Sequence, residues 1–199
     1  MKNLPYILIA IRFLCAPVIL YLSYFAGTES RFIILSLMYI GLFTDIFDGI
    51  IARKLNVSTE KLRRLDSQID LIFWLSIGFA AYFLNPDLIK TEWLSIVLVF
   101  SLEVLCYLVS WIKFGKETCT HAWLSKLWGV SLVIAFTYLI GFQNAGWAFD
   151  LAVILGLISH LDVILIILIL PKWQYDIPTF YHAWKIRKGK KLKKSVLVN

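Results

Sequence analysis

Six long apolar runs constrain this chain more than any other feature. They cover roughly residues 6–25, 32–52, 66–84, 93–112, 124–142 and 147–170. Each is close to the roughly twenty residues that an α-helix needs to cross a bilayer. The hydrophobic content of 60% is also above the roughly one half that is usual in soluble domains. We therefore expect an all-α integral membrane protein with six transmembrane helices and short loops.

Two other interpretations of these runs fit less well. A membrane β-barrel would alternate polar and apolar residues along segments of about ten residues, whereas residues 151–157 and 163–170 do not alternate. A cleaved signal peptide would have a shorter apolar stretch and a small-residue cleavage site. The first run is long and contains Arg12, so we expect a transmembrane helix there.

Lysine and arginine predict the orientation of the helices. They gather in residues 53–64 and 113–126 and after Pro171, whereas the opposite side has only Arg31 and Lys90. Because positive residues favour the cytoplasmic side, we expect both termini in the cytoplasm and the protein in the inner (cytoplasmic) membrane. The net charge of +7 then reflects a basic rim beside anionic lipids, and no nucleic-acid partner is expected.

The composition predicts two parts. Residues 1–175 would form the membrane domain and residues 176–199 a basic cytoplasmic tail. Pro178 can occupy an early position in a helix, and Phe180 and Trp184 would supply its interfacial apolar face. A tail that only tethers the chain to the membrane surface is the simpler alternative.

Four aspartates form the pattern with the clearest chemistry. Asp45 and Asp48 are three residues apart at the end of the second run, and Asp66 and Asp70 are four apart at the start of the third. These spacings place each pair on one helix face, so a short turn lets all four carboxylates converge. At a membrane boundary such a group is costly unless a cation neutralises it. Oxygen ligands suit Mg²⁺, Mn²⁺ or Ca²⁺ rather than zinc, and two ions would suit displacement at phosphorus.

Neighbouring residues fit a phosphate ligand. Gly49 permits close approach of the backbone to a ligand, and Arg53 offers a planar fork for phosphate oxygens. The alternative is that the aspartates only neutralise Arg63 and Arg64 as surface ion pairs.

This segment resembles the signature of the CDP-alcohol phosphatidyltransferase family, D-x2-D-G-x2-A-R-x8-G-x3-D-x3-D. The matching residues are Asp45, Asp48, Gly49, Ala52, Arg53, Asp66 and Asp70. One position departs from the signature, because Leu62 stands where the family has glycine, near the nucleotide. The stretch from Asn3 through Arg12 to Pro17 also looks like the family's opening helix.

The resemblance implies a phospholipid-synthesising transferase with six helices and cytoplasmic termini. The donor would be CDP-diacylglycerol, the leaving group CMP and the acceptor a polar alcohol. Asp45, Asp48, Asp66 and Asp70 would hold two Mg²⁺ or Mn²⁺ ions, and Asp70 would be the general base. The CDP-binding residues would be Asp48, Gly49, Ala52 and Arg53. The active site would face the cytoplasm, and the family commonly forms homodimers.

The acceptor is predicted from weaker signals. Candidate binding residues on the expected cytoplasmic side are Arg63, Arg64, His121, Ser125 and Lys126. The stretch 122–126 looks somewhat like the entry to the fifth helix of phosphatidylglycerophosphate and cardiolipin synthases. An anionic acceptor would bind a cation there, so we expect glycerol 3-phosphate. Inositol phosphate, serine or another alcohol remains open, and a lysine at that place also serves topology.

Three ionisable residues lie within the later apolar runs. Glu103 is in the fourth run, and His160 and Asp162 are in the sixth. Such residues are functional candidates, but they can equally bond across helices or across a dimer interface. Two other functions also compete with the transferase: a cation transporter using the carboxylates, and an inactive membrane scaffold, which the Leu62 departure leaves open.

Overall fold

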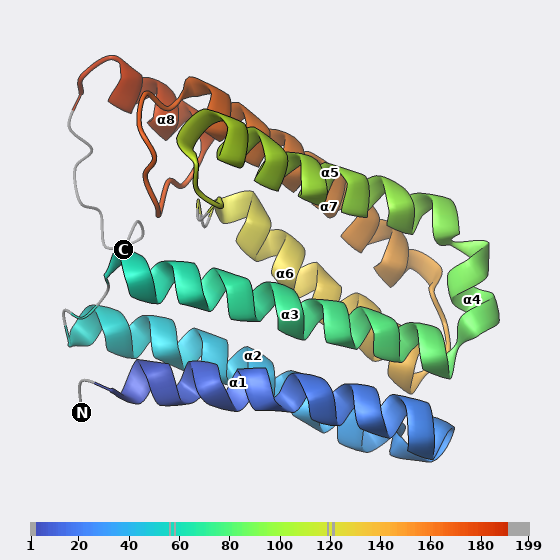
Figure 1. Cartoon of the computed structure of the whole chain (residues 1–199). Helices are drawn as coiled ribbons and strands as arrows, with labels where there is room; N and C mark the ends of the chain where they lie inside the picture. Colours follow the sequence, from blue (N-terminus) through green and yellow to red (C-terminus); the bar gives the residue numbers. More distant parts are fainter. Residues whose placement is uncertain (1–2, 56, 58, 119, 121, 191–199) are drawn as a thin grey trace. The chain divides into compact units, whose positions relative to one another are not determined.

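The structure is a computed structural model of the whole chain, and it describes residues 3–55, 57, 59–118, 120 and 122–190. Every regular element in these residues is helical, which confirms the all-α prediction (Figure 1). Five helical runs are long and apolar enough to cross a membrane: Leu4–Lys54, Glu60–Leu84, Trp93–Phe114, Trp123–Gly141 and Gly146–Ile169. The integral membrane class therefore fits the structure.

The first of these runs, of 51 residues, contains two helices, in agreement with the two apolar runs at 6–25 and 32–52. It consists of α1 (Leu4–Tyr21), a π-helical turn (Leu22–Ala26), a 3₁₀ turn (Gly27–Ser30) and α2 (Arg31–Lys54). Gly27 has a positive φ of 58°, which suits glycine because it lacks a Cβ. The chain reverses there, and α1 packs against α2. The count of six spans and the cytoplasmic position of the termini stay predictions.

The chain divides into two compact units, which we describe separately. Unit 1 contains residues 1–91 and 133–146, and unit 2 contains residues 92–132 and 147–199. In unit 1, α1 also packs against α3 (Glu60–Leu84), and the three helices lie side by side in Figure 1. The short helix α4 (Pro86–Thr91) follows α3, and a π-helical turn (Thr137–Gly141) returns to the unit.

The core of unit 1 holds its helices at close range. Ile19, Ile34, Met38, Phe73 and Ile77 are all nearly inaccessible to solvent and pack in one apolar cluster. Gly41 of α2 lies directly against Phe73 of α3, because a Cβ at this glycine would come within 2.2 Å of the ring Cζ. A glycine is therefore needed where α2 meets the Phe73 ring.

Unit 2 is built from α5 (Trp93–Phe114), the first part of α6 (Trp123–Phe136), α7 (Gly146–Ile169) and α8 (Phe180–Arg187). Ile177 and Ala183 of the tail are buried with Cys106, Ile166 and Ile167. The Ile177 amide donates to the Thr120 carbonyl at 2.7 Å, and the Trp123 amide donates to the Pro178 carbonyl at 3.0 Å. The described part of the tail is thus packed into unit 2, and a tail helix does form, beginning at Phe180.

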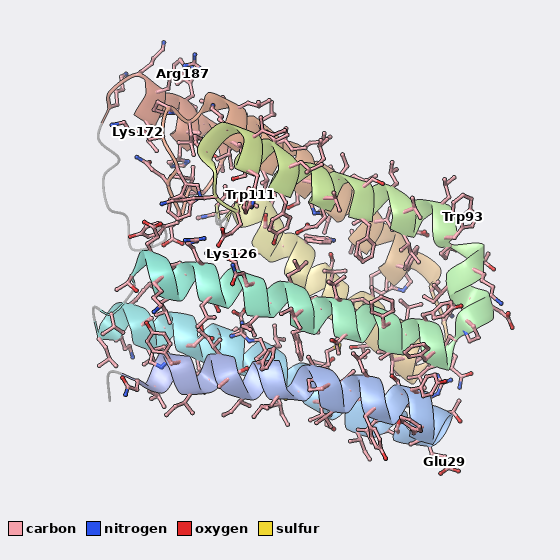
Figure 2. The ribbon with its side chains drawn as sticks, in the orientation of Figure 1. Glu29, Trp93, Trp111, Lys126, Lys172 and Arg187 are labelled. Atoms are coloured by element: carbon pink, nitrogen blue, oxygen red, sulfur yellow. The ribbon has the colours of Figure 1, made fainter. Side chains whose placement is uncertain are left out.

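The basic residues labelled in unit 2 lie towards one end of the unit, and a labelled tryptophan lies near each end of α5 (Figure 2). Figure 2 shows Lys126, Lys172 and Arg187 towards one end of the unit and Trp93 at the other end of α5 from Trp111. Trp93 and Trp111 are 60% and 61% exposed, as expected of aromatic residues at the two membrane interfaces. The division of the chain at residue 175, like its orientation, stays a prediction.

Candidate active site

The acidic cluster predicted from the sequence forms within unit 1. Asp45 and Asp48 lie in the second half of α2, and Asp66 and Asp70 lie in the first turns of α3. Oxygens of Asp45, Asp48 and Asp66 are all within 4.8 Å of one another, a spacing that could hold a metal ion. Asp70 joins them through a shared arginine partner. The two ends of α2 and α3 therefore converge as the spacing indicated.

Helix capping fixes where α3 begins. The Thr59 hydroxyl accepts a hydrogen bond from the Leu62 amide at 3.2 Å, which is the usual role of threonine at an N-cap. Glu60 follows in the first turn, where a negative charge favours the positive end of the helix dipole. This start places Asp66 and Asp70 in the second and third turns, on the face turned towards α2.

Arg12 of α1 is the centre of the cluster. Its Nη1 lies 3.3 Å from Asp45 Oδ1 and 3.1 Å from Asp66 Oδ1. The same nitrogen donates to Asp70, and Nη2 donates to Asp48. The arginine is 1% exposed, and within the described part of the chain its Nε has no hydrogen-bond partner. One guanidinium thus balances part of the charge of four carboxylates.

Sequence reasoning mentioned Arg12 but assigned it no role in the site. The signal was present, since a charged residue inside an apolar run is costly and often functional. Its partners could not be named, because they lie 33 to 58 positions further along the chain. Only the packing of α1 on α2 and α3 brings them together.

The four acids differ in their access to solvent. The side chains of Asp48 and Asp66 are 4% and 7% exposed, whereas those of Asp70 and Asp45 are 27% and 41% exposed. Asp48 and Asp66 therefore form the buried floor of the cluster. Asp45 and Asp70 form its open side, where a substrate can reach the carboxylates.

Two groups of residues surround the cluster: Arg53 beside Gly49, and an apolar group that contains Ala52 and Leu62. Arg53 folds back along α2, so that its Nη1 is 3.5 Å from the position that a Cβ on Gly49 would take. Ala52 and Leu62 are each 3% exposed and pack with Ile9 and Ile69 in a small apolar cluster. Leu62, the one position that departs from the signature this segment resembles, therefore joins α1, α2 and α3 by packing.

The predicted acceptor residues are not all placed in one group. Arg63 and Arg64 follow Leu62 on α3 in unit 1, with Arg63 only 6% exposed. Ser125 and Lys126 belong to unit 2, where the Ser125 hydroxyl is 3.0 Å from that of Ser159 and Lys126 is exposed. His121 lies outside the described residues.

The ionisable residues of the later runs form contacts within unit 2. Glu103 of α5 bonds to Nε2 of His160 on α7, whose Nδ1 is 2.5 Å from the Gly156 carbonyl. The Trp128 ring of α6 lies 4.6 Å from the imidazole. Asp162 accepts from the Phe180 amide at 3.3 Å, at the start of α8. These contacts link helices, as the structural alternative predicted.

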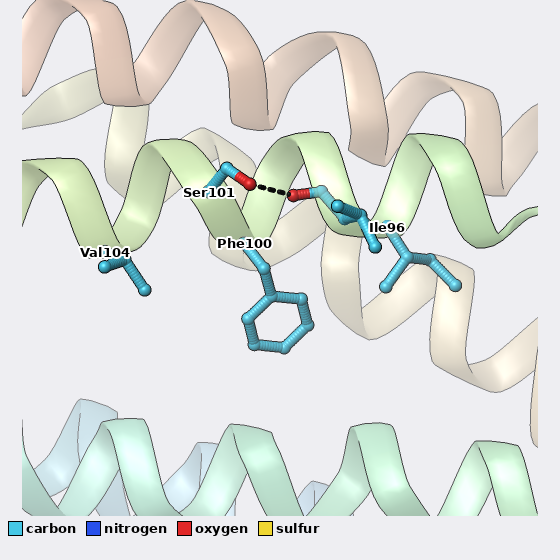
Figure 3. Close-up of a pocket in the computed structure, with 5 residues that line it drawn as sticks. Ile96, Phe100, Ser101 and Val104 are labelled. Atoms are coloured by element: carbon cyan, nitrogen blue, oxygen red, sulfur yellow. Dashed lines mark hydrogen bonds between the residues drawn. The ribbon is translucent and has the colours of Figure 1, made fainter.

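An apolar hollow on α5 has no comparable chemistry. It is lined by Ile96, Val97, Phe100, Ser101 and Val104, as Figure 3 shows. Its one hydroxyl, on Ser101, already donates to the Val97 carbonyl at 2.7 Å. The acidic cluster is therefore the stronger candidate for an active site.

Comparison with known proteins decides the class of chemistry. The family model described as CDP-alcohol phosphatidyltransferase matches residues 2–170, which is most of the chain and includes all four acids and Arg12. The chain belongs to the CDP-alcohol phosphatidyltransferase family. Searches of curated proteins and of solved structures found no match.

Membership in the CDP-alcohol phosphatidyltransferases confirms several predictions. The protein is a membrane-embedded transferase of substituted phosphate groups that acts in phospholipid synthesis. It moves a phosphatidyl group from a CDP-alcohol to an alcohol, and the family depends on divalent metal in general. The likeness to phosphatidylglycerophosphate synthases stays a prediction.

The carboxylates fit such an ion by their chemistry. Mg²⁺ and Mn²⁺ prefer oxygen ligands, and each of Asp45, Asp48 and Asp66 offers a carboxylate oxygen within the same small volume. No nitrogen or sulfur donor belongs to this set of three. The ligand chemistry thus agrees with the metal dependence of the family.

Proposed function

We propose that this protein transfers the phosphatidyl group of CDP-diacylglycerol to glycerol 3-phosphate and releases CMP. The observation that carries the proposal is the convergence of Asp45, Asp48 and Asp66 within a chain that matches the family over residues 2–170. The proposed site faces the cytoplasm of the inner membrane, where the positive residues accumulate, and the protein is proposed to be a homodimer.

Asp45, Asp48, Asp66 and Asp70 would together hold two Mg²⁺ or Mn²⁺ ions. When bound, such ions neutralise phosphate charge and polarise the phosphorus centre. The chain's own contribution is to position the ligands: the two buried acids, Asp48 and Asp66, are held by α2 and α3. Rigid helices suit this role, because phosphoryl transfer depends largely on positioning and electrostatics.

Asp70 is proposed as the general base. Its carboxylate accepts the proton of the acceptor hydroxyl while the new oxygen–phosphorus bond forms and the bond to the CMP oxygen breaks. Asp70 suits this role because its side chain is 27% exposed beside two acids that are almost fully buried. A general base must reach the proton that it removes.

The donor would bind beside the acids on α2. Asp48, Gly49, Ala52 and Arg53 are the proposed CDP-binding residues. The Arg53 guanidinium lies next to Gly49, where it offers two donors to a diphosphate oxygen pair. Ala52 is buried behind this surface, so its small side chain contributes by leaving room rather than by direct contact.

The acceptor is proposed from charge. Glycerol 3-phosphate is a dianion, and the proposed binding residues Arg63, Arg64, His121, Ser125 and Lys126 include three residues with permanent positive charge. Inositol phosphate would use the same cations, whereas serine, a neutral zwitterion, would use them less. A panel of acceptors separates these possibilities.

The test is CMP release by the purified full-length protein with CDP-diacylglycerol, Mg²⁺ or Mn²⁺, and each acceptor in turn. We expect turnover with glycerol 3-phosphate, abolished by EDTA and by Asp70→Asn. Asp87→Asn is the matched control, because the Asp87 side chain is 98% exposed on α4 and pairs with nearby Lys90. No CMP with any acceptor would favour an inactive scaffold, and divalent-ion flux in liposomes would favour a transporter.

A further inference from the structure

Arg12 contacts the same carboxylates that a divalent ion would bind. Its Nη1 is 3.3 Å from Asp45 Oδ1 and 3.1 Å from Asp66 Oδ1, and its remaining hydrogen bonds go to Asp48 and Asp70. Asp45, Asp48 and Asp66 are also the three residues whose oxygens are grouped closely enough to hold an ion. The guanidinium and the ion therefore have one set of ligands.

The two cations exclude each other for geometric and electrostatic reasons. Mg²⁺ binds oxygen at about 2.0–2.1 Å and demands a nearly ideal octahedron. An ion held by these carboxylates would lie close to a positive guanidinium that already hydrogen-bonds to the same residues. Arginine cannot lose its charge to relieve this repulsion, whereas movement of the guanidinium out of the cluster would relieve it.

We propose that Arg12 is the resident counter-ion of the four aspartates, and that a divalent ion enters the site by displacing its guanidinium. This inference rests on the proposed function, since it concerns the ions that the transferase uses. Binding of the divalent ion is then an exchange of cations: the ion enters the acidic cluster, and the Arg12 guanidinium of α1 leaves it.

The contacts of Arg12 suit an exchangeable group. Among the residues that the structure describes, its Nε has no partner, and the hydrogen bonds and ion pairs of its two Nη atoms go to the four acids. Moving the guanidinium therefore breaks only bonds that the incoming ion replaces. Without Arg12, four convergent carboxylates would be uncompensated in a poorly solvated place, which is costly.

Arg31 supplies a matched control in the same unit. It is also buried, at 7% exposure, and its Nε also has no partner among the described residues. Its Nη atoms donate to the Ile140 carbonyl, the Leu84 carbonyl and the Asn85 side-chain oxygen at 2.8, 3.2 and 3.1 Å. Because these partners carry no net charge, we expect no competition between a divalent ion and Arg31.

The experiment measures Mn²⁺ binding directly, without substrate. Purified full-length protein in detergent is titrated with Mn²⁺, and free Mn²⁺ is read from its electron paramagnetic resonance signal. The variants are Arg12→Gln, Arg12→Lys and Arg31→Gln, with Lys90→Gln as an exposed-cation control. The melting temperature of each variant is measured in EDTA and in Mn²⁺, and CMP release by the wild type is measured on the same preparation.

Removal of a competitor should tighten binding of the ion. We expect Arg12→Gln to bind Mn²⁺ about tenfold or more tightly than the wild type, as for competing ligands with a coupling of ordinary size. Its melting temperature should fall in EDTA and recover more with Mn²⁺ than that of the wild type, because a ligand stabilises the state that binds it. Arg31→Gln and Lys90→Gln should keep the wild-type affinity.

Arg12→Lys covers the case in which Arg12→Gln does not fold. An ammonium keeps the charge but cannot contact four carboxylates as a planar guanidinium does, so its Mn²⁺ affinity should lie between those of the wild type and Arg12→Gln. Mn²⁺ affinity that is unchanged or weaker in the folded Arg12 variants would overturn the exchange. If the wild type still releases CMP in that case, the proposed transferase function stands without the exchange. If the wild type neither binds Mn²⁺ nor releases CMP, the exchange and the proposed function are both wrong.

Discussion

Arg12 and Arg31 are both buried in unit 1, yet their partners are of opposite kinds. Arg12 contacts four carboxylates near the end of α2, whereas Arg31 begins α2 and donates to carbonyl oxygens and an amide. Backbone carbonyls at helix ends need donors in any state of the protein. Carboxylates can also bind other cations, so Arg12 can be exchanged, whereas Arg31 stabilises the fold.

The Arg31 region ties three segments together. Its guanidinium joins the start of α2 to the end of α3 at Leu84 and to the π-helical turn at Ile140. Asn85 strengthens this junction by donating to the Leu139 carbonyl at 2.9 Å. Burial without charge compensation is tolerated here because each hydrogen bond involves a charged donor, which makes it stronger than a neutral one.

The largest expected effect is a loss of activity when one of the aspartates that contact Arg12 is replaced. Asp66→Asn should lower CMP release about a thousandfold, because one buried ligand of the ion and its charge are lost. The melting temperature in EDTA should change little, since three carboxylates still pair with Arg12. Asp87→Asn serves as the control. Retention of full activity by Asp66→Asn would remove Asp66 from the site.

Arg31→Gln should have the largest effect on stability. Loss of the guanidinium leaves the Ile140 and Leu84 carbonyls without their donor, which should cost about 3 kcal/mol of unfolding free energy. The measurement is thermal unfolding in detergent, with CMP release normalised to folded protein. We expect that normalised activity to stay near wild type. A stable but inactive Arg31→Gln would place Arg31 in the active site, and the two arginines would then no longer differ in function.

Gly41→Ala tests the helix contact between the two arginine regions. The added methyl group would meet the Phe73 ring within 2.2 Å, and overpacking of this kind costs about 1–3 kcal/mol. Thermal unfolding should show the loss, and Phe73→Leu in the same chain should recover part of it. Gly78→Ala on α3 is the matched control, because no atom lies within 4 Å of a Cβ there.

The smallest effect is expected in unit 2. Glu103→Gln replaces the carboxylate that bonds to His160 Nε2 and should cost about 1 kcal/mol, in the range of polar contacts between membrane helices. CMP release per folded molecule should stay within about twofold of wild type, because this pair connects helices and holds no ligand in our proposal. A large loss of activity with unchanged melting temperature would give Glu103 a function beyond packing.

Several features could be predicted because they depend on neighbours along the chain. The helical class follows from apolar runs of membrane length, and the convergence of Asp45 with Asp48 and of Asp66 with Asp70 follows from helical periodicity. The family was recognisable because its signature lies within residues 45–70. The pairing of Glu103 with His160 was foreseen only as one of several possible contacts across helices.

Other features depend on residues far apart in sequence. The 3₁₀ geometry of Gly27–Ser30 between α1 and α2 was not foreseen, because Gly27, Thr28 and Glu29 resemble an ordinary loop. Leu62 was recognised as a departure from the family, but its packing with Ile9 depends on where α1 lies. The docking of Ile177 and Ala183 in unit 2 could not be foreseen from a basic tail.

By itself, the sequence determined the helical membrane class, the family and the identity of the four acids, since hydrophobicity and helical periodicity act over short stretches of chain. Only the tertiary structure decided that Arg12 meets those acids, that Arg31 meets carbonyls instead, and that Asp48 and Asp66 are buried while Asp45 and Asp70 are accessible. The physical reason is that the partner of a buried charge is chosen by helix packing, which brings together residues that no local pattern connects.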